Sequence, residues 1–484
     1  MRYDNLLANV PIDLYIGGTW RPAASGERFD VDDPATETPV ASVASAGVED
    51  AKAAVDAASG AFEAWSGRKP RERAEILRKA YELIIQDSER FARLITLENG
   101  KALIDSRAEV AYSAEFFRWY AEEAVRNIGE VSRAPSSGAR ILVQHKPAGV
   151  AVLVTPWNFP AAMATRKIGP ALAAGCPVVL KPASETPLTM LALMPLLEAA
   201  GVPGGVVNVI PSRRSGAVVD AMLSDPRVRV ISFTGSTATG RKLLHSAADN
   251  VLKSAMELGG NAPFIVFEDA DVEAAVEGAL IAKMRNIGEA CTAANRFYVH
   301  EKVHDAFASL LCKRMGALKM GHGLEEGVSV GALVNAETRD KVANLVDDAL
   351  AKGATALLGG KAPERTGYFY PATVLTRVAA DAQMMHEEIF GPVAALQTFA
   401  SDSEVIAKAN ATEYGLVAYV YTGDIGRGLR VCERLDYGMV GLNRGLVSDP
   451  AAPFGGTKQS GIGREGAHVG LMEFMETQYI SVSW

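Results

Sequence analysis

Residues 228–244 read VRVISFTGSTATGRKLL, and this stretch indicates the fold. An apolar run at 228–233 passes into a loop of Gly, Ser and Thr at 234–240, and a helical pattern follows. A buried strand that leads into such a loop presents backbone N–H groups and the positive end of a helix dipole, which suits a phosphate group. The same residues also suit an ordinary helix start capped by Ser236 or Thr237, and the segment alone favours neither interpretation.

The residues before this stretch alternate between buried-type strands and helices. Apolar runs of strand length are separated by longer segments with helical periodicity. Strands that alternate with helices form βαβ units, which build a parallel sheet with right-handed crossovers. The expected strands are 150–155, 178–181, 206–210 and 228–233, and the expected helices are 160–174, 187–200 and 216–223.

The same alternation resumes after residue 257. The expected strands are 264–267, 297–299, 394–399, 417–421 and 439–442, and the expected helices are 271–284, 303–315 and 342–351. Ligands of open α/β sheets bind at the carboxyl ends of the strands. We therefore predict an α/β fold with two Rossmann-like parallel-sheet domains, with functional residues at the strand ends.

Two segments depart from this alternation. Polar strand-like stretches at 125–147 flank the turn sequence APSSG at 134–138, so we expect a protruding hairpin. Residues 479–484 alternate apolar and polar side chains like a strand, but no partner strand is close in the sequence. This terminal strand is expected to add to a sheet, across subunits if none in its own chain receives it, so the two segments predict a small β oligomerisation element.

The composition excludes several classes of function. The 484 residues carry 49 Lys and Arg against 57 Asp and Glu, and the net charge of −8 repels nucleic acids and anionic membranes. Four widely spaced cysteines form neither a disulfide framework nor a CxxC metal site. The first residues lack a signal-peptide pattern, and the longest apolar run, 169–180, is shorter than the roughly 20 residues that span a bilayer. We therefore expect a cytoplasmic protein without nucleic-acid or membrane partners.

Two matches to known motifs are interpreted as coincidental. Residues 461–466 fit GxGxxG, but a loop precedes them where the dinucleotide-binding motif requires a strand. Residues 300–304 fit the zinc motif HExxH, but His300 ends a predicted strand and the helix begins only near 303. The two histidines therefore do not share a helix turn, and we expect no metal site.

Cys291 is the candidate nucleophile. It lies in the small, polar segment NIGEACT at 286–292, which favours an accessible thiol over an inert buried one. Upstream, Glu257 begins the segment ELGGN at 257–261 and on its own suits a solvated charge at a helix end. A carboxylate opposite a thiol can instead act as general base for water that attacks a thioester. A cysteine hydrolase that uses histidine remains an alternative on these residues.

Several motifs of the chain resemble those of one enzyme family. They are TPWNFP (155–160), KPAS (181–184), FTGST (233–237), ELGG (257–260), GEAC (288–291), EIFGP (388–392) and PFGG (453–456). Their order, over essentially the whole chain, is similar to that of the NAD(P)-dependent aldehyde dehydrogenases. Within this family the chain resembles the succinate-semialdehyde dehydrogenases through TRKIGPA (165–171), KMRN (283–286) and GLVS (445–448). No histidine falls in these motifs, which disfavours the hydrolase.

The resemblance implies the catalytic and cofactor-binding residues. Cys291 would attack the aldehyde carbon, and the Asn158 side chain and the Cys291 backbone N–H would hold the oxyanion. Glu257 would activate water against the resulting thioester. The implied cofactor-binding residues are Thr155, Trp157, Lys181, Ser184, Gly235, Ser236, Leu258, Glu388 and Phe390.

Ser184 bears on the choice between NADP and NAD. Relatives that prefer NAD often carry Glu at this position, where it repels a 2′-phosphate. Ser184 removes that repulsion and Lys181 adds a cation, so NADP is the favoured cofactor and NAD the alternative. Glu185 is a neighbouring negative charge that weakens this preference.

The resemblance also implies a substrate with a distal carboxylate. Arg166, Arg285 and Ser448 match the carboxylate-binding set of the succinate-semialdehyde dehydrogenases, although arginines also form structural ion pairs. Glu289 stands where many of these relatives have Gln, and Arg444 adds a charge near the expected substrate mouth. Succinate semialdehyde is therefore the expected substrate, with glutarate semialdehyde, lactaldehyde and betaine aldehyde as alternatives.

Domain boundaries and assembly follow from the same resemblance. Residues 1–124 and 148–258 would form the cofactor-binding domain and 259–466 the catalytic domain. Residues 125–147 and 467–484 would form the oligomerisation element, giving a homodimer or a homotetramer.

Overall fold

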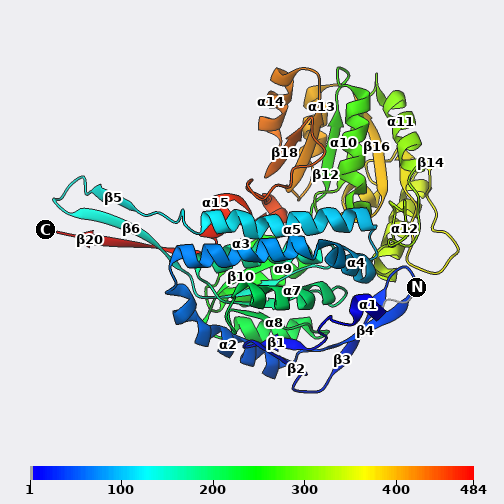
Figure 1. Cartoon of the computed structure of the whole chain (residues 1–484). Helices are drawn as coiled ribbons and strands as arrows, with labels where there is room; N and C mark the ends of the chain where they lie inside the picture. The colour runs from blue at the N-terminus through cyan, green and yellow to red at the C-terminus, as the bar shows by residue number, and fades with distance from the viewer. Residues whose placement is uncertain (1–3, 484) are drawn as a thin grey trace.

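The computed structural model describes residues 4–483, and two large sheets form its two halves (Figure 1). The first sheet has the strand order β19-β11-β10-β7-β8-β9-β1-β2. The five central strands are parallel, whereas β19, β1 and β2 pair antiparallel at the two edges. Its strands are β1 (Leu14–Ile16), β2 (Thr19–Arg21), β7 (Val150–Val154), β8 (Val178–Lys181), β9 (Val207–Val209), β10 (Val228–Thr234), β11 (Lys253–Glu257) and β19 (Gly461–Ile462).

Helices cover both faces of this sheet. Every residue of β7, VAVLV, is buried, which is typical of a parallel strand between two helical layers. Val152 belongs to the hydrophobic cluster that includes α2, α8 and α9, whereas Leu153 points to the opposite face and belongs to the cluster that includes α3, α5, α6 and α7. These helices are α2 (Val48–Ser66), α3 (Pro70–Gln86), α5 (Leu103–Glu123), α6 (Pro160–Ala174), α7 (Leu188–Ala200), α8 (Ser215–Leu223) and α9 (Thr237–Ala248).

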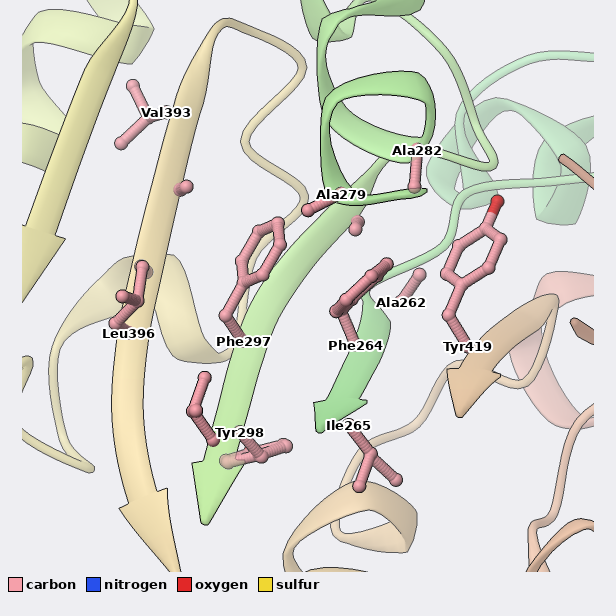
Figure 2. Close-up of a cluster of buried hydrophobic side chains, with 14 of the residues drawn as sticks. Ala262, Phe264, Ile265, Ala279, Ala282, Phe297, Tyr298, Val393, Leu396 and Tyr419 are labelled. Atoms are coloured by element: carbon pink, nitrogen blue, oxygen red, sulfur yellow. The ribbon is translucent and has the colours of Figure 1, made fainter. Parts of the chain in front are cut away.

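The second sheet has the order β14-β15-β16-β13-β12-β17-β18 and is parallel except for β14. Figure 2 shows part of its core, where Phe264 of β12 lies beside Phe297 of β13, with ring centroids 5.2 Å apart. Ala279 and Ala282 of α10 cover these rings. The strands are β12 (Ala262–Val266), β13 (Ala294–His300), β14 (Thr355–Leu358), β15 (Thr373–Thr376), β16 (Val393–Phe399), β17 (Val417–Tyr421) and β18 (Met439–Leu442). The helices are α10 (Val272–Met284), α11 (His304–Gly316), α12 (Ala336–Ala351), α13 (Asp402–Asn410) and α14 (Ile425–Arg434). The predicted α/β class with two parallel-rich sheets is confirmed.

A three-stranded sheet protrudes from the molecule (Figure 1). Its strands β5 (Glu130–Arg133) and β6 (Arg140–Pro147) form the predicted hairpin. The C-terminal strand β20 (Met475–Val482), which follows α15 (Ala467–Met472), pairs antiparallel with β6 along its whole length. The expectation of pairing across subunits is corrected for this edge of β6, because β20 of the same chain already occupies it.

An N-terminal hairpin was not expected from the sequence. It consists of β3 (Arg28–Asp33) and β4 (Thr38–Ala44). β3 contacts α4 (Ser88–Asn99), which also contacts the short helix α1 (Asp4–Leu7). β3 alternates exposed and buried residues, but one of the buried ones is Asp33, which accepts hydrogen bonds from Ala35 N and Thr36 Oγ1. A strand with a charged residue on its buried face lacks the apolar alternation that sequence analysis detects.

The HExxH match at 300–304 spans a strand end and a helix start, as expected. His300 is the last residue of β13 and His304 the first of α11, so the two side chains do not share a helix turn. Across residues 4–483, no cluster of three or more His, Cys, Asp or Glu is placed to hold a metal ion. Within the same residues, no helix combines the length and apolar character needed to cross a membrane.

Candidate active site

A cavity of about 340 Å³ lies where residues that follow β7, β10 and β11 meet two loops from the second half of the chain. The first of these loops carries Cys291, and the second contains Glu388 and Phe390. Predicted site residues that line the cavity are Trp157, Asn158, Gly235, Ser236, Leu258, Cys291, Glu388 and Phe390. The fold thus brings together residues that are widely separated in the sequence.

The nucleophile loop has an unusual backbone. After α10, Asn286 and Ile287 have φ values of 51° and 49°, in the left-handed region that β-branched residues rarely adopt. Asn286 Nδ2 donates hydrogen bonds to Asn158 O (2.8 Å) and to Glu289 O (2.9 Å), which hold the turn in place. Strained backbone that the surroundings support in this way is common in active sites, and here it presents Cys291 to the cavity.

Cys291 is half-buried and surrounded by charged groups. Burial raises the pKa of the thiol to about 12, and Glu388 and Glu257 act in the same direction, while Arg166 and Arg285 lower the pKa. The neutral thiol is therefore favoured in this state. Positive charge near the sulfur opposes the effect of burial and favours the nucleophilic thiolate.

Two hydrogen-bond donors are available next to the thiol. Asn158 is buried, and its Nδ2 donates to Glu289 O at 3.0 Å, which leaves the second hydrogen of the amide free. Within residues 4–483 the backbone N–H of Cys291 makes no hydrogen bond. A negative oxygen formed on a carbon bonded to the sulfur could accept from both groups.

Glu257 is the last residue of β11 and is 3% exposed. Neither of its carboxyl oxygens has a hydrogen-bond partner in the described chain. Burial and the charge of Glu465 raise the pKa of Glu257 well above its usual value, against the opposing effect of Arg166. A glycine pair, Gly259 and Gly260, follows Glu257. A side chain at position 260 would clash with the nucleophile loop, because its Cβ would lie 2.8 Å from Cys291 O.

Two of the three predicted substrate-binding residues lie near Cys291. Arg166, in α6, forms an ion pair with Glu465 and stacks on Phe454, but its buried Nη2 has no hydrogen-bond partner in the described chain. Arg285 stacks on Phe159, 4.7 Å from the ring centroid. No contact recorded for residues 4–483 joins Ser448 to either arginine, and Ser448 lies half-buried in the loop after β18.

Three predicted cofactor residues lie outside the cavity lining. Thr155 follows β7, which pairs with β10, Lys181 ends β8 on the other side of β7, and Ser184 lies three residues further on. Burial lowers the pKa of Lys181 to about 8, and Glu185 partly offsets this effect. Ser184 Oγ donates a hydrogen bond to Glu185 Oε2 at 3.2 Å. Ser236 is the N-cap of α9, where its Oγ accepts from Thr239 N.

A buried ion pair beneath Asn158 was missed by sequence analysis. Lys101 Nζ donates to Glu109 Oε2 (2.7 Å) and to Asn158 O (2.5 Å). Glu109 Oε1 accepts from the backbone N–H groups of Ala161 and Ala162 at the start of α6. The sequence offers no signal for this pair, because a lysine after a helix end is usually solvated.

Comparison with known proteins places this geometry in a family. Residues 20–480 match the aldehyde dehydrogenase family. The chain is 52% identical to a succinate-semialdehyde dehydrogenase of Paenarthrobacter nicotinovorans, over 92% of this chain and 99% of that protein. It is 48% identical to the NADP(+) succinate-semialdehyde dehydrogenase of Escherichia coli (strain K12), over 96% and 97% of the two chains. It is 46% identical to a 3-sulfolactaldehyde dehydrogenase of Pseudomonas putida, over 96% of each chain.

A solved structure extends this similarity to three dimensions. The crystal structure of succinate-semialdehyde dehydrogenase from Burkholderia pseudomallei superposes with a TM-score of 0.97 at 48% identity, covering 100% of this chain and 99% of that one. With matching sequence, fold and a cysteine at the meeting point of the two halves, the chain belongs to the aldehyde dehydrogenase family.

Proposed function

We propose that this protein oxidises succinate semialdehyde to succinate with NADP(+). The observation that carries the proposal is the position of Arg166 and Arg285, both close enough to Cys291 to lower the pKa of its thiol. Arg166 Nη2 is buried without a partner, and the Arg285 guanidinium contacts aromatic rings rather than a carboxylate. A buried guanidinium with unused donors suits a substrate carboxylate.

The residues of the site support a reaction in two stages. In the first, the Cys291 sulfur bonds to the aldehyde carbon, and the oxyanion accepts hydrogen bonds from Asn158 Nδ2 and the Cys291 N–H. The chemistry that a bound oxidised nicotinamide would supply here is that of an acceptor for the hydride that this carbon loses. In the second stage Glu257 takes a proton from water, the water oxygen bonds to the thioester carbon, and the carbon–sulfur bond breaks. Succinate then leaves and the Cys291 thiolate is restored.

The cavity fits a nicotinamide dinucleotide. Ser236 and Gly235 lie at the N-terminus of α9, where backbone N–H groups suit the pyrophosphate. Trp157 and Phe390, in edge-to-face contact with centroids 5.4 Å apart, line the same cavity as Cys291 and suit a flat ring. Thr155, Leu258 and Glu388 complete the proposed set. The Lys181 cation and the absence of a carboxylate at Ser184 favour NADP over NAD.

The same arginines discriminate among the alternative substrates. Their positive charge opposes the quaternary ammonium of betaine aldehyde and gives no advantage to uncharged lactaldehyde. Glutarate semialdehyde, one methylene longer, remains an alternative. A sulfonate presents the same charge as a carboxylate, so an aldehyde of the kind named for the Pseudomonas putida relative is the second candidate.

A substrate panel tests the proposal. The near-ultraviolet absorbance of the reduced cofactor reports kcat/KM for succinate semialdehyde, glutarate semialdehyde, 3-sulfolactaldehyde and butanal, each with NADP(+) and NAD(+). Succinate semialdehyde with NADP(+) should rank first. Arg285→Met should lower its kcat/KM by about 10- to 150-fold, the value of a hydrogen bond to a charged group, and leave butanal nearly unchanged. An unchanged ranking in this variant contradicts the assignment of Arg285.

The proposal also assigns functions to the domains of the chain and predicts that the protein forms oligomers. Residues 1–124 and 148–258 serve cofactor binding and 259–466 serve catalysis, while 125–147 and 467–484 join subunits into a homodimer or homotetramer. Ile128 and Val131, 78% and 74% exposed at the hairpin, support this role for the protruding sheet. Light scattering after size exclusion would measure the subunit number.

Four free cysteines suit the reducing cytoplasm in which we place the enzyme.

A further inference from the structure

Lys283 is a fully buried lysine that the proposed reaction does not use. It lies near the end of α10, is 1% exposed, and donates from Nζ to Asn295 Oδ1 (2.9 Å) and to Gly391 O (3.2 Å). Burial lowers the pKa of Lys283 to about 7, and the charge of Glu388 opposes the shift. Burying an ammonium group is costly unless its hydrogen bonds serve a purpose, so these partners require an explanation.

The hydrogen bond to Gly391 lies where two loops of the site touch. Gly288, in the nucleophile loop, has φ +81°, and a Cβ on it would lie 2.2 Å from Gly391 O. Gly391 belongs to the segment that contains Glu388 and Phe390, both of which line the cavity. The carbonyl that Lys283 binds is therefore the same one against which the backbone of the nucleophile loop packs.

The position of Lys283 is itself well defined. It follows Ala282, which packs with Ala279 over the aromatic core of the second sheet (Figure 2). It precedes the strained turn at Asn286 and Ile287. A side chain anchored in this way can hold Gly391 at a set distance from the Cys291 loop.

We infer that Lys283 is a positioning residue that ties the segment 388–391 to the nucleophile loop and so sets the nicotinamide site relative to Cys291. The inference rests on the proposed use of a nicotinamide cofactor, but not on the identity of the aldehyde. If the tie is lost, the two loops separate, and both cofactor binding and the surroundings of the thiol change.

Two variants break this contact from opposite sides. Lys283→Met keeps an unbranched side chain one atom shorter and removes the ammonium donors, and Gly288→Ala inserts a methyl group against Gly391 O without changing charge. Lys319→Met is the matched control, because Lys319 Nζ also donates to a backbone carbonyl, that of Glu326, in an exposed turn outside the cavity lining.

The test uses two readouts that do not depend on turnover. Quenching of tryptophan fluorescence gives the NADP(+) dissociation constant, and mass spectrometry of the Cys291 peptide gives its rate of alkylation by iodoacetamide in the free enzyme. Both variants should weaken NADP(+) binding at least about tenfold, which for Lys283→Met is the lower end of the value of a hydrogen bond to a charged group. Both should also change the alkylation rate at least about threefold. The control should change neither value.

Three other results overturn the inference. In the first, the variants lose thermal stability but keep both readouts, so Lys283 is only structural. In the second, cofactor binding weakens while alkylation is unchanged in both variants, so the two loops are independent. In the third, the alkylation rate of Cys291 changes while the NADP(+) dissociation constant does not, so Lys283 does not position the nicotinamide site. A parent enzyme that binds neither NADP(+) nor NAD(+) would instead refute the proposed function.

Discussion

Replacing Asn158 with alanine should separate oxyanion binding from the other functions of the site. Asn158 Nδ2 makes one hydrogen bond, to Glu289 O at 3.0 Å. That carbonyl keeps a second donor, Asn286 Nδ2 at 2.9 Å, so the nucleophile loop remains held after the substitution. The backbone carbonyl of residue 158 also keeps both of its donors, Lys101 and Asn286.

The two expected effects differ in size. Losing one hydrogen bond whose acceptor stays satisfied should lower the free energy of unfolding by about 1 kcal/mol. Losing one of two oxyanion donors should lower kcat by about 10²- to 10³-fold, or about 2.7–4 kcal/mol in the activation free energy. Asn158→Ala is therefore expected to give a folded protein that is nearly inactive.

The assay must separate a missing donor from a displaced thiol. The burst of reduced cofactor in the first turnover of succinate semialdehyde reports the oxidation stage, which passes through the oxyanion. Alkylation of Cys291 by iodoacetamide forms no oxyanion, so Asn158→Ala should leave its rate within about threefold of the parent. A burst rate close to that of the parent would refute the oxyanion role. A parallel fall of both rates would show that Asn158 positions Cys291 instead.

Three further predictions address the cofactor, the thiol and the core. Ser184→Glu should lower the ratio of kcat/KM for NADP(+) to that for NAD(+) by about 10- to 100-fold, because the new carboxylate repels a 2′-phosphate. An unchanged ratio would show that Ser184 does not belong to the cofactor site. Since the pKa of Cys291 is raised to about 12, its thiolate fraction in the free enzyme should increase about tenfold per pH unit from pH 7 to 9. The alkylation rate of Cys291 measures this fraction. A rate that reaches a plateau in that range would contradict the raised pKa. Phe264→Ala removes a fully buried ring whose centroid lies 5.2 Å from that of Phe297, and it should lower the free energy of unfolding by about 3–5 kcal/mol in urea titrations. A loss below about 1 kcal/mol would mean that neighbouring side chains fill the space that the ring leaves.

The parallel sheets were predictable because their strands are buried on both faces. Continuous apolar runs such as VAVLV need no knowledge of partners, and Val178–Lys181 and Val417–Tyr421 have the predicted bounds. The hairpin of β3 and β4 was missed because Asp33 occupies a buried position that only its hydrogen-bond partners justify. The pairing of β20 with β6 was missed because its partner lies more than 300 residues earlier in the chain.

The candidate site was predictable only where motifs mark it. Cys291, Glu257 and Asn158 lie in short motifs that contain glycine or proline and can be found in the sequence without knowledge of the fold. Lys101 lies in none of these motifs, and Lys283 begins the motif KMRN (283–286) but had no expected role, since their partners Asn158 and Gly391 come from other parts of the chain. Arg166 was expected to bind a substrate carboxylate, which stays a prediction, and its ion pair with Glu465 was not expected, because the two residues lie far apart in the sequence.

Glu257 and Glu465 are buried carboxyl groups that affect each other, and they differ in a way that supports the role of Glu257. Glu465 makes ion pairs with Arg166 and Lys167, and these cations lower its pKa in spite of its burial. Its negative charge, together with burial, raises the pKa of Glu257 well above the usual value. A carboxylate that is ion-paired with two cations is a poor proton acceptor, whereas a carboxylate with a raised pKa and no hydrogen-bond partner is a stronger base. Burial and the negative charge of Glu465 thus make the Glu257 carboxylate the stronger base of the two, as a group that takes a proton from water must be.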